Sequence, residues 1–273
     1  MPHQLSVHGV TVPTLGFGTY KITGADATHA VRYALDVGYR HIDTAQIYEN
    51  ETEVGQGIAA SGVPRNEIFL TTKVWRDSLA PDDVARTTEA SLRRLGTDYV
   101  DLLLMHWPND RVPLADTLGV LASLRDAGKA RLIGVSNVPP GMLRRALEIE
   151  PTLATNQVEY HPYLGQDDLL DVIREAGMFL TAYRPIANGG VMQDETLREI
   201  AETHGATPVQ IVLAWLIAQD GVAAIPKSAT PAHIESNVRA LDLTLSSDEI
   251  AAVDALERGE RLVSPDFAPD WNA

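Results

Sequence analysis

The feature that most constrains the fold of this chain is a recurring unit, in which a short apolar run is followed by a polar loop and a helical stretch. Eight such runs occur along the 273 residues, and successive runs in the first half start about 30 residues apart, the length of one βα unit. The runs are continuous in Val, Ile and Leu instead of alternating with polar residues, as in a buried parallel sheet. This pattern predicts an α/β protein of the closed (β/α)8 TIM-barrel type.

The predicted elements cover most of the chain. Strands are expected at residues 15–19, 41–44, 68–73, 99–106, 131–137, 154–160, 179–183 and 222–228. Helices are expected between them at residues 26–37, 51–60, 81–95, 116–127, 141–149 and 167–176. The last unit is longer, with one helix at 194–203 and a second that starts at the capping box Thr207-Pro208-Val209-Gln210.

Both ends of the chain extend beyond the repeated units. A capping box at 246–249 predicts an extra C-terminal helix that runs to about Leu256, and the tail 261–273 has no periodicity and is expected to be a loop. Ahead of the first strand, QLSV-HG-VTVP predicts a β-hairpin that plugs the bottom of the barrel. No linker or charge block divides the chain, so we expect residues 1–273 to form a single domain.

Charge and composition exclude several functions. The net charge of −15 disfavours binding to nucleic acids or anionic membranes, because phosphate would repel the chain. The absence of cysteine excludes disulfides, zinc–thiolate sites and cysteine nucleophiles, and we expect no metal site. The first residues lack the apolar core of a signal peptide, and the longest apolar run, 211–218, is too short to span a bilayer. We therefore expect a cytoplasmic protein, and nothing in the sequence requires more than a monomer.

Polar side chains stand where the predicted strands end, which is the end of a barrel that carries the chemistry. Asp43, Lys73 and His106 end three consecutive strands, and Tyr48 lies in the loop after Asp43. Each alone has an ordinary structural explanation, as a helix cap, a solvated charge or a packed ring. Together they would be costly to bury unless their charges pair, so we expect one shared site. Later strands end in Ser136, Asn137, Gln157, Glu159, Tyr183, Lys227 and Ser228.

These four side chains suit proton donation to a carbonyl oxygen. A phenol titrates at roughly 10 in water, too high to protonate an alkoxide quickly at neutral pH, and a nearby ammonium is expected to lower that pKa. Asp43 would hold Lys73 charged and in place, Tyr48 would donate the proton, and His106 would orient the carbonyl. No side chain supplies hydride, so carbonyl reduction requires a nicotinamide cofactor.

Seven motifs occur in order along nearly the whole chain: GFGTYK (16–21), GYRHIDTAQIYENETEVGQGI (38–58), FLTTKVW (69–75), DYVDLLLMHWP (98–108), GVSN (134–137), NQVEYHPY (156–163) and IPKSATPAHIESN (225–237). In these motifs the chain resembles the aldo-keto reductase family. Within it the chain is most similar to bacterial 2,5-diketo-D-gluconate reductases of the B type, through HIDTAQIYEN and the ending RLVSPDFAPDW (261–271). The resemblance implies NADPH-dependent reduction of small aldehydes and ketones, with 2,5-diketo-D-gluconate or methylglyoxal as substrate types.

The resemblance also implies roles for individual residues. The family's catalytic tetrad falls on Asp43, Tyr48, Lys73 and His106. Around the nicotinamide, the implied cofactor contacts are Gly18, Thr19, Tyr20, Asp43, Ser136, Asn137, Gln157 and the ring of Tyr183. Lys227 and Ser228 would meet the 2′-phosphate and Asn237 the adenine, since a Lys charge and a hydroxyl suit a phosphate. No G-x-G-x-x-G fingerprint is present, so the binding would not be of the Rossmann type.

Three positions depart from the family pattern. His233 stands where an Arg usually follows the phosphate-binding Lys, and Ser236 stands where a Glu often precedes the adenine-facing Asn. His is mostly neutral at pH 7, so it would attract the 2′-phosphate less strongly than Arg does. We therefore expect NADPH as the cofactor, with NADH as an alternative. Arg184 replaces the Ser of the AYSPL pattern, and it would either reach the pyrophosphate or lie at the surface.

The substrate pocket is expected to be walled by Tyr20, Trp75, His106 and Trp107. The short loop at residues 108–113 would leave this pocket open enough for small polar carbonyl compounds, and Arg111 in that loop would attract a carboxylate.

Two alternatives to a reductase follow from the same residues. In the first, the chain is an aldolase barrel in which Lys73 is a Schiff-base nucleophile, although a nearby Asp43 would keep the Lys73 amine protonated. In the second, the chain is a non-catalytic redox sensor that binds NADPH and signals to a partner.

Overall fold

The chain folds around a parallel sheet, and the computed structural model describes residues 3–271 of it. The sheet has eight strands in the order β10-β9-β8-β7-β6-β5-β4-β3, and each hydrogen-bonded pair is parallel. The strands are β3 (Phe17–Gly18), β4 (His41–Asp43), β5 (Phe69–Val74), β6 (Val100–Met105), β7 (Ala130–Ser136), β8 (Thr155–Glu159), β9 (Phe179–Tyr183) and β10 (Val222–Ala224). Each lies within or overlaps a run that the sequence predicted as a strand.

The two edge strands meet and close the sheet into a barrel. The N–H of Gly16 donates to the carbonyl oxygen of Ala224 at 2.8 Å, and that of Gly18 donates to Pro226 at 2.9 Å. A Cβ on Gly18 would lie 3.0 Å from the carbonyl oxygen of Ile225, so the close approach at this seam favours glycine. The prediction of a closed (β/α)8 barrel is therefore confirmed.

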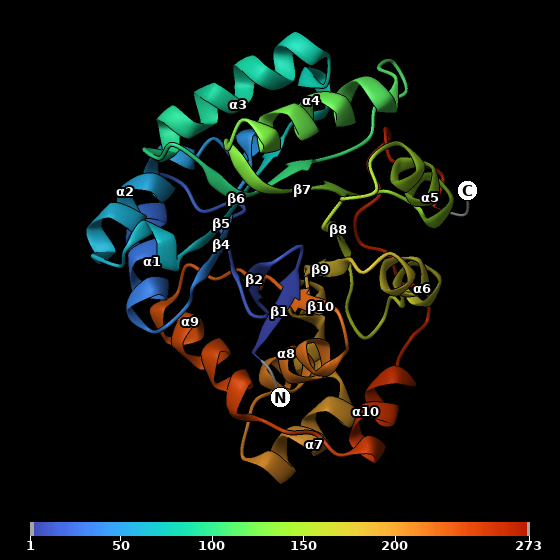
Figure 1. Cartoon of the computed structure of the whole chain (residues 1–273). Coiled ribbons are helices and arrows are strands. Elements are labelled where there is room, and N and C mark those ends of the chain that lie inside the picture. Colours follow the sequence, from blue (N-terminus) through green and yellow to red (C-terminus); the bar gives the residue numbers. More distant parts are fainter. Residues whose placement is uncertain (1–2, 272–273) are drawn as a thin grey trace.

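Helices surround the strands on the outside of the barrel (Figure 1). They are α1 (Gly24–Asp36), α2 (Glu51–Ser61), α3 (Pro81–Leu95), α4 (Leu114–Asp126), α5 (Pro140–Ile149), α6 (Asp167–Glu175), α7 (Glu195–His204), α8 (Pro208–Ala218), α9 (Pro231–Val238) and α10 (Ser247–Asp254). The capping boxes predicted at the starts of α8 and α10 are both formed. Helix α9 was not predicted. It is only 8 residues long and has no side-chain cap, so the sequence shows little beyond a Pro in its first turn.

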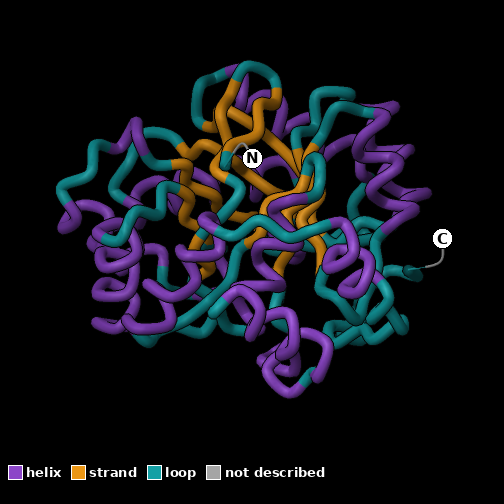
Figure 2. The backbone as a smooth tube through the Cα atoms, turned by 90° about the horizontal axis from the view of Figure 1, so that it is seen from below, coloured by secondary structure: helices purple, strands orange, loops and turns teal. Residues whose placement is uncertain are grey.

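A hairpin closes the bottom of the barrel, as predicted. Strands β1 (Gln4–Val7) and β2 (Val10–Pro13) pair antiparallel around His8 and Gly9, which both have positive φ, as a tight hairpin turn requires. Figures 1 and 2 show this hairpin lying across one end of the barrel strands. Its Val7, Val10 and Val12 pack in one buried cluster with residues inside the barrel: Phe69, Leu102, Leu104, Leu132, Ala154, Phe179 and Ala223.

A second and larger core lies between the strands and the surrounding helices. It contains the outward-facing strand residues, such as Ile42 and Met105, and the buried faces of the helices. Among residues 3–271, no helix has the length and apolar character needed to cross a membrane. The helices and the hairpin therefore leave one end of the barrel, that of the strand carboxyl ends, for a functional site.

Candidate active site

Asp43, Tyr48, Lys73 and His106 come together at the carboxyl ends of the strands. Asp43 is the last residue of β4, Lys73 lies near the end of β5, and His106 directly follows β6. Tyr48 ends the short 3-10 helix η1 (Gln46–Tyr48) in the loop after β4. The Nζ of Lys73 lies 2.6 Å from the Oδ1 of Asp43 and 3.4 Å from the hydroxyl oxygen of Tyr48. The Tyr48 and His106 rings are 5.8 Å apart.

The ion pair between Lys73 and Asp43 is buried. Lys73 is 0% exposed and Asp43 is 1% exposed. The ammonium also donates to the carbonyl oxygen of Thr44 at 2.7 Å, so Asp43, Thr44 and Tyr48 account for its three donors. Burial lowers the pKa of Lys73, while the charges of Asp43 and Glu51 act in the opposite direction. A buried charge of this kind is tolerated because it is paired and fully hydrogen-bonded.

The pKa of Tyr48 differs from the prediction. Burial, with a smaller contribution from the charge of Asp43, raises the pKa of the Tyr48 phenol well above its usual value. The predicted lowering by Lys73 is wrong, because burial of the phenol and the charge of Asp43, which lies 2.6 Å from the ammonium, outweigh the effect of Lys73. The phenol therefore carries its proton at neutral pH.

His106 is neutral at physiological pH. Burial, aided by the charge of Lys73, lowers its pKa well below the usual value. Its Nδ1 is buried and has no hydrogen-bond partner among the described residues. The backbone carbonyl of His106 accepts a hydrogen bond from the side-chain amide of Asn137 at 2.9 Å, which fixes the residue to the end of the next strand.

Ser136, Asn137, Gln157 and Tyr183 form a hydrogen-bonded chain that leads to Asp43. The Nε2 of Gln157 donates to the Oδ2 of Asp43 at 2.8 Å. The hydroxyl of Ser136 donates to the backbone carbonyl of Gln157 and accepts from Asn137, whose Oδ1 accepts from the hydroxyl of Tyr183 at 2.7 Å. The structure thus places four of the predicted cofactor residues beside the predicted catalytic ones.

The first loop lies on the other side of Asp43. The hydroxyl of Thr19 donates to the backbone carbonyl of Asp43 at 3.0 Å, and the side chain of Asn50 donates to the carbonyl of Thr19 at 2.9 Å. Tyr20 is 43% exposed, and its ring lies 5.0 Å from that of Tyr48. Gly18, Thr19 and Tyr20 therefore border the site, as the resemblance implied.

The predicted phosphate and adenine residues lie farther along the barrel rim, on the segment from β10 into α9. The backbone of Lys227 forms a β-bridge with that of Gly18 across the seam of the barrel. The Lys227 side chain is exposed, and no described carboxylate lies within ion-pair distance of it. Ser228 accepts a hydrogen bond from the N–H of Thr230 at 3.1 Å. His233 is exposed on α9, whereas Asn237 is buried. Among residues 3–271, no hydrogen bond joins this group to the four predicted catalytic residues.

Arg184 and Arg111 make few contacts. Arg184 follows β9 with a φ of 49°, is partly buried, and forms no hydrogen bond or ion pair with another described side chain. Arg111 is exposed in the loop after β6, where its N–H donates to the side chain of Asn109. Among the described residues, neither arginine forms a hydrogen bond or an ion pair with the four predicted catalytic residues.

The aromatic wall of the site has a member that the sequence did not predict. The rings of Trp75 and His106 are 5.3 Å apart, and Trp75 is partly exposed. Phe267, from the C-terminal tail, lies 5.9 Å from Trp75 and 5.5 Å from Trp107. Trp107 is only 5% exposed because Phe267 and Trp271 cover it. Residues 261–271 of the tail lack regular structure as predicted, and 272–273 lie outside the described residues; the aromatic residues Phe267 and Trp271 were the signal that the tail covers other side chains.

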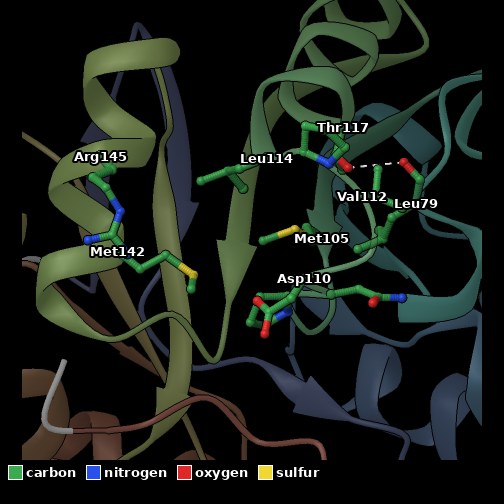
Figure 3. A pocket seen from close by; sticks show the side chains of 11 residues that line it. Leu79, Met105, Asp110, Val112, Leu114, Thr117, Met142 and Arg145 are labelled. Atoms are coloured by element: carbon green, nitrogen blue, oxygen red, sulfur yellow. Dashed lines mark hydrogen bonds between the residues drawn. The ribbon is translucent and has the colours of Figure 1, made fainter.

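A separate cavity of about 260 Å³ lies between the loop after β6 and helices α4 and α5 (Figure 3). Its floor is apolar, with Met105 and Met142 among the side chains, and Arg145 and Asp110 stand at its wall. None of the predicted catalytic, cofactor or substrate residues lines it. It is therefore distinct from the site described above.

Comparison with known proteins agrees with this geometry. The model of the aldo/keto reductase family matches residues 14–258. The chain is 40% identical to methylglyoxal reductase DkgB of Salmonella typhi, covering 96% of this chain and 100% of that protein. It is 44% identical to an aldo-keto reductase of Mycolicibacterium smegmatis, with 93% of each chain covered. Among solved structures, a protein described as a 2,5-diketo-D-gluconic acid reductase B superposes with a TM-score of 0.97 at 46% identity, covering 100% of this chain and 98% of that one. The chain therefore belongs to the aldo/keto reductase family and is an oxidoreductase.

Proposed function

We propose that this protein reduces small aldehydes and ketones to alcohols with NADPH, and that Tyr48 donates the proton. The observation that carries the proposal is the position of the Tyr48 hydroxyl, 3.4 Å from an ammonium that is held by Asp43 at 2.6 Å, at the carboxyl ends of the strands. Members of this family are reductases that act with nicotinamide cofactors, and this arrangement gives a carbonyl oxygen a proton donor that is already protonated at neutral pH.

The four residues have separate tasks in the reaction. A bound nicotinamide supplies the hydride to the carbonyl carbon. Tyr48 gives its proton to the oxygen, which would otherwise become an alkoxide. The ammonium of Lys73 then stabilises the phenolate that remains, and Asp43 holds that ammonium in place. Neutral His106 orients the carbonyl by hydrogen bonding, without adding a second charge beside Lys73.

The residues on the barrel rim fit a nicotinamide dinucleotide phosphate. Ser136, Asn137 and Gln157 present amide and hydroxyl groups of the kind that a carboxamide requires, next to Asp43. Lys227 is an exposed cation that pairs with no described carboxylate in a chain of net charge −15, and such a group suits a phosphate better than an uncharged ribose. We therefore favour NADPH, with NADH as a weaker alternative because His233 replaces an arginine.

For the substrate we favour small polar carbonyl compounds of the methylglyoxal or 2,5-diketo-D-gluconate type. Two relatives carry these names, methylglyoxal reductase DkgB and 2,5-diketo-D-gluconic acid reductase B. The aromatic wall of Tyr20, Trp75 and Phe267 narrows the site, which limits the size of the compound that reaches Tyr48. From the composition we also propose a monomeric, single-domain enzyme of the cytoplasm.

The test is turnover of methylglyoxal and 2,5-diketo-D-gluconate by the wild type and by Tyr48→Phe. The variant keeps the ring but loses the proton, so kcat should fall at least about 100-fold, the lower range for loss of a general acid, with the NADPH dissociation constant unchanged. A variant that keeps more than about a tenth of the wild-type kcat would show that Tyr48 is not the donor.

The same assay separates the alternatives. A redox sensor would bind NADPH but turn over no carbonyl compound. An aldolase would form a Schiff base, so borohydride with substrate would leave a covalent adduct on Lys73. We expect no adduct, because Asp43 at 2.6 Å keeps the Lys73 amine protonated and poorly nucleophilic.

A further inference from the structure

The C-terminal tail crosses the mouth of the barrel after α10 and is attached at both ends of its path. Near its start, the N–H groups of Arg258 and Glu260 donate to the carbonyl oxygen of Tyr163 at 3.4 Å and 2.8 Å. At its far end, Phe267 packs against Trp75 and Trp107 beside the site. The segment between these contacts has no regular secondary structure, so it needs attachments of its own to keep one path.

One buried carboxylate supplies that attachment. Glu159 is the last residue of β8 and is 0% exposed. Its Oε1 accepts from the backbone N–H of Leu262 at 2.8 Å, and its Oε2 accepts from that of Val263 at 2.9 Å. The Nε2 of His161, also 0% exposed, lies 3.1 Å from Oε1. No described Lys or Arg forms an ion pair with this carboxylate.

The charge of Glu159 is held by the tail itself. Burial alone would raise the pKa of this carboxyl, but the hydrogen bonds from His161, Leu262 and Val263 outweigh burial and leave the pKa below its usual value. The carboxylate is therefore ionised at neutral pH. If the tail moved away, two of these hydrogen bonds would be lost and a buried anion would be left poorly compensated, which disfavours any other path of the tail.

Glu159 does not belong to the predicted catalytic set. The described partners of its side chain are His161, Leu262 and Val263, and none of Asp43, Tyr48, Lys73 or His106 is among them. Glu159 lies opposite Tyr183 on the neighbouring strand β9, and it reaches the aromatic wall of the site through the tail, since the residues that it binds lie a few positions before Phe267. A change at Glu159 should therefore alter how the tail covers the site and leave the reacting groups in place.

We propose that Glu159 is a positioning residue, which fixes the C-terminal tail over the active site and thereby sets the affinity for the carbonyl substrate. This inference rests on the proposed reductase function. The Glu159 side chain lies buried beneath the tail, and it would affect substrate binding without touching substrate or cofactor.

The first test is Glu159→Gln in the full-length protein. The amide has nearly the same size but places an NH2 group opposite one of the backbone donors, so the tail is held less firmly. We expect KM for methylglyoxal to rise about tenfold, with kcat changed less than about threefold and the NADPH dissociation constant less than about twofold. Glu148→Gln, at an exposed position of α5, makes the same change of charge and should leave all three values unchanged.

The second test measures the tail without using catalysis. Trypsin cleaves after arginine, and Arg258 and Arg261 lie just before the two residues that Glu159 holds, Leu262 and Val263. We expect Glu159→Gln to be cut in the tail about tenfold faster than the wild type or Glu148→Gln, because proteolysis follows the population of the open form. Equal cleavage rates would overturn the proposal whether or not the protein reduces methylglyoxal.

A double-mutant comparison shows whether the effect passes through the tail. In Phe267→Ala the tail no longer packs against Trp75 and Trp107, so adding Glu159→Gln to that variant should cause no further rise in KM. A further tenfold rise in the double variant, or a parallel change in the NADPH dissociation constant, would overturn the proposal. If the wild type reduces no carbonyl compound, the proposed function fails, and the cleavage rates still decide whether Glu159 holds the tail.

Discussion

Lys73 is the residue on which the electrostatics of the site depend. Within residues 3–271 it is the only cation bonded directly to both Asp43 and Tyr48, and burial lowers its pKa. The lowered pKa means that the ammonium is present below this pKa and is lost as the pH rises through it. Because Lys73 stabilises the phenolate left on Tyr48, the reductase activity should fall on the basic side.

Replacement of Lys73 by Met tests this assignment. We expect kcat to fall at least about 100-fold, since the phenolate loses its charged hydrogen-bond donor, and the residual rate to lack the basic limb of the wild-type pH profile. Lys129→Met, at a surface lysine paired with Glu89, removes the same charge far from the site and should leave the profile unchanged. A Lys73→Met profile of wild-type shape would mean that another group produces the basic limb.

At the same scale, the sequence predicted which residues meet but not the environment that they create. Strand ends converge in any barrel, so Asp43, Lys73 and His106 were foreseeable neighbours. The direction of the Tyr48 pKa was wrong because it depends on how deeply the phenol is buried, and that depth follows from tertiary packing. Phe267 was missed for a related reason, since the tail that carries it has no periodicity to indicate its path.

Among the elements, α9 carries the clearest consequence for cofactor choice. His233 is exposed on this helix, which follows Lys227 and Ser228 along the rim. We expect His233→Arg to bind NADPH about tenfold more tightly and NADH no more tightly, because a permanent charge and planar donors add a charged hydrogen bond to a phosphate. The gain should shrink with added salt.

Titration of both dinucleotides by fluorescence quenching measures this change. His29→Arg, at an exposed position of α1, adds the same charge elsewhere and serves as the control. An equal gain for NADH and NADPH in His233→Arg would show that position 233 does not contact the 2′-phosphate.

The N-terminal hairpin should affect stability and leave the chemistry alone. Val12 is 0% exposed and packs into the bottom of the barrel, at the end opposite to the site. We expect Val12→Ala to lower the free energy of unfolding by about 2 kcal/mol, through lost burial and the cavity left behind. Thr11→Ala, on the exposed face of the same strand, should cost less than about 0.5 kcal/mol. Urea unfolding measures both, and an altered KM in Val12→Ala would contradict the separation of plug and site.

Most elements were predictable because their signals are local. Apolar runs marked the strands, and capping boxes marked the starts of α8 and α10. The strands are nevertheless shorter than predicted at the seam, where β3 has 2 residues and β10 has 3. Their lengths depend on how the barrel closes, which is a property of two segments far apart in the chain.

For the molecule as a whole, two buried histidines should make stability depend on acidity. Burial lowers the pKa of both His41 and His106 in the folded state. Below roughly pH 6.5 the unfolded chain then binds more protons than the folded one, so stability falls as the pH falls. We expect the free energy of unfolding to fall between pH 7 and pH 5, by at most about 2 kcal/mol per histidine, the limit for an imidazole that stays neutral over this range.

Urea unfolding at pH 7, 6 and 5 measures this loss. His106→Gln should remove the larger part of it, because the pKa of His106 is lowered further than that of His41, whereas His29→Gln, at an exposed position, should leave it intact. Carboxylates with lowered pKa values, such as Glu159, become protonated only at more acidic pH and add their losses there. An unfolding free energy that stays constant from pH 7 to pH 5 would contradict the assignment of both histidines as neutral.

The seam between β3 and β10 has a consequence for how the molecule is made. The hydrogen bonds of Gly16 and Gly18 reach partners about 200 residues later in the chain. During synthesis at about 5–20 residues per second, β3 gains its neighbour β4 early but waits about 10–40 seconds for its other neighbour to leave the ribosome. Throughout that interval one edge of β3 is open to foreign strands, so the barrel closes only after β10 has been translated.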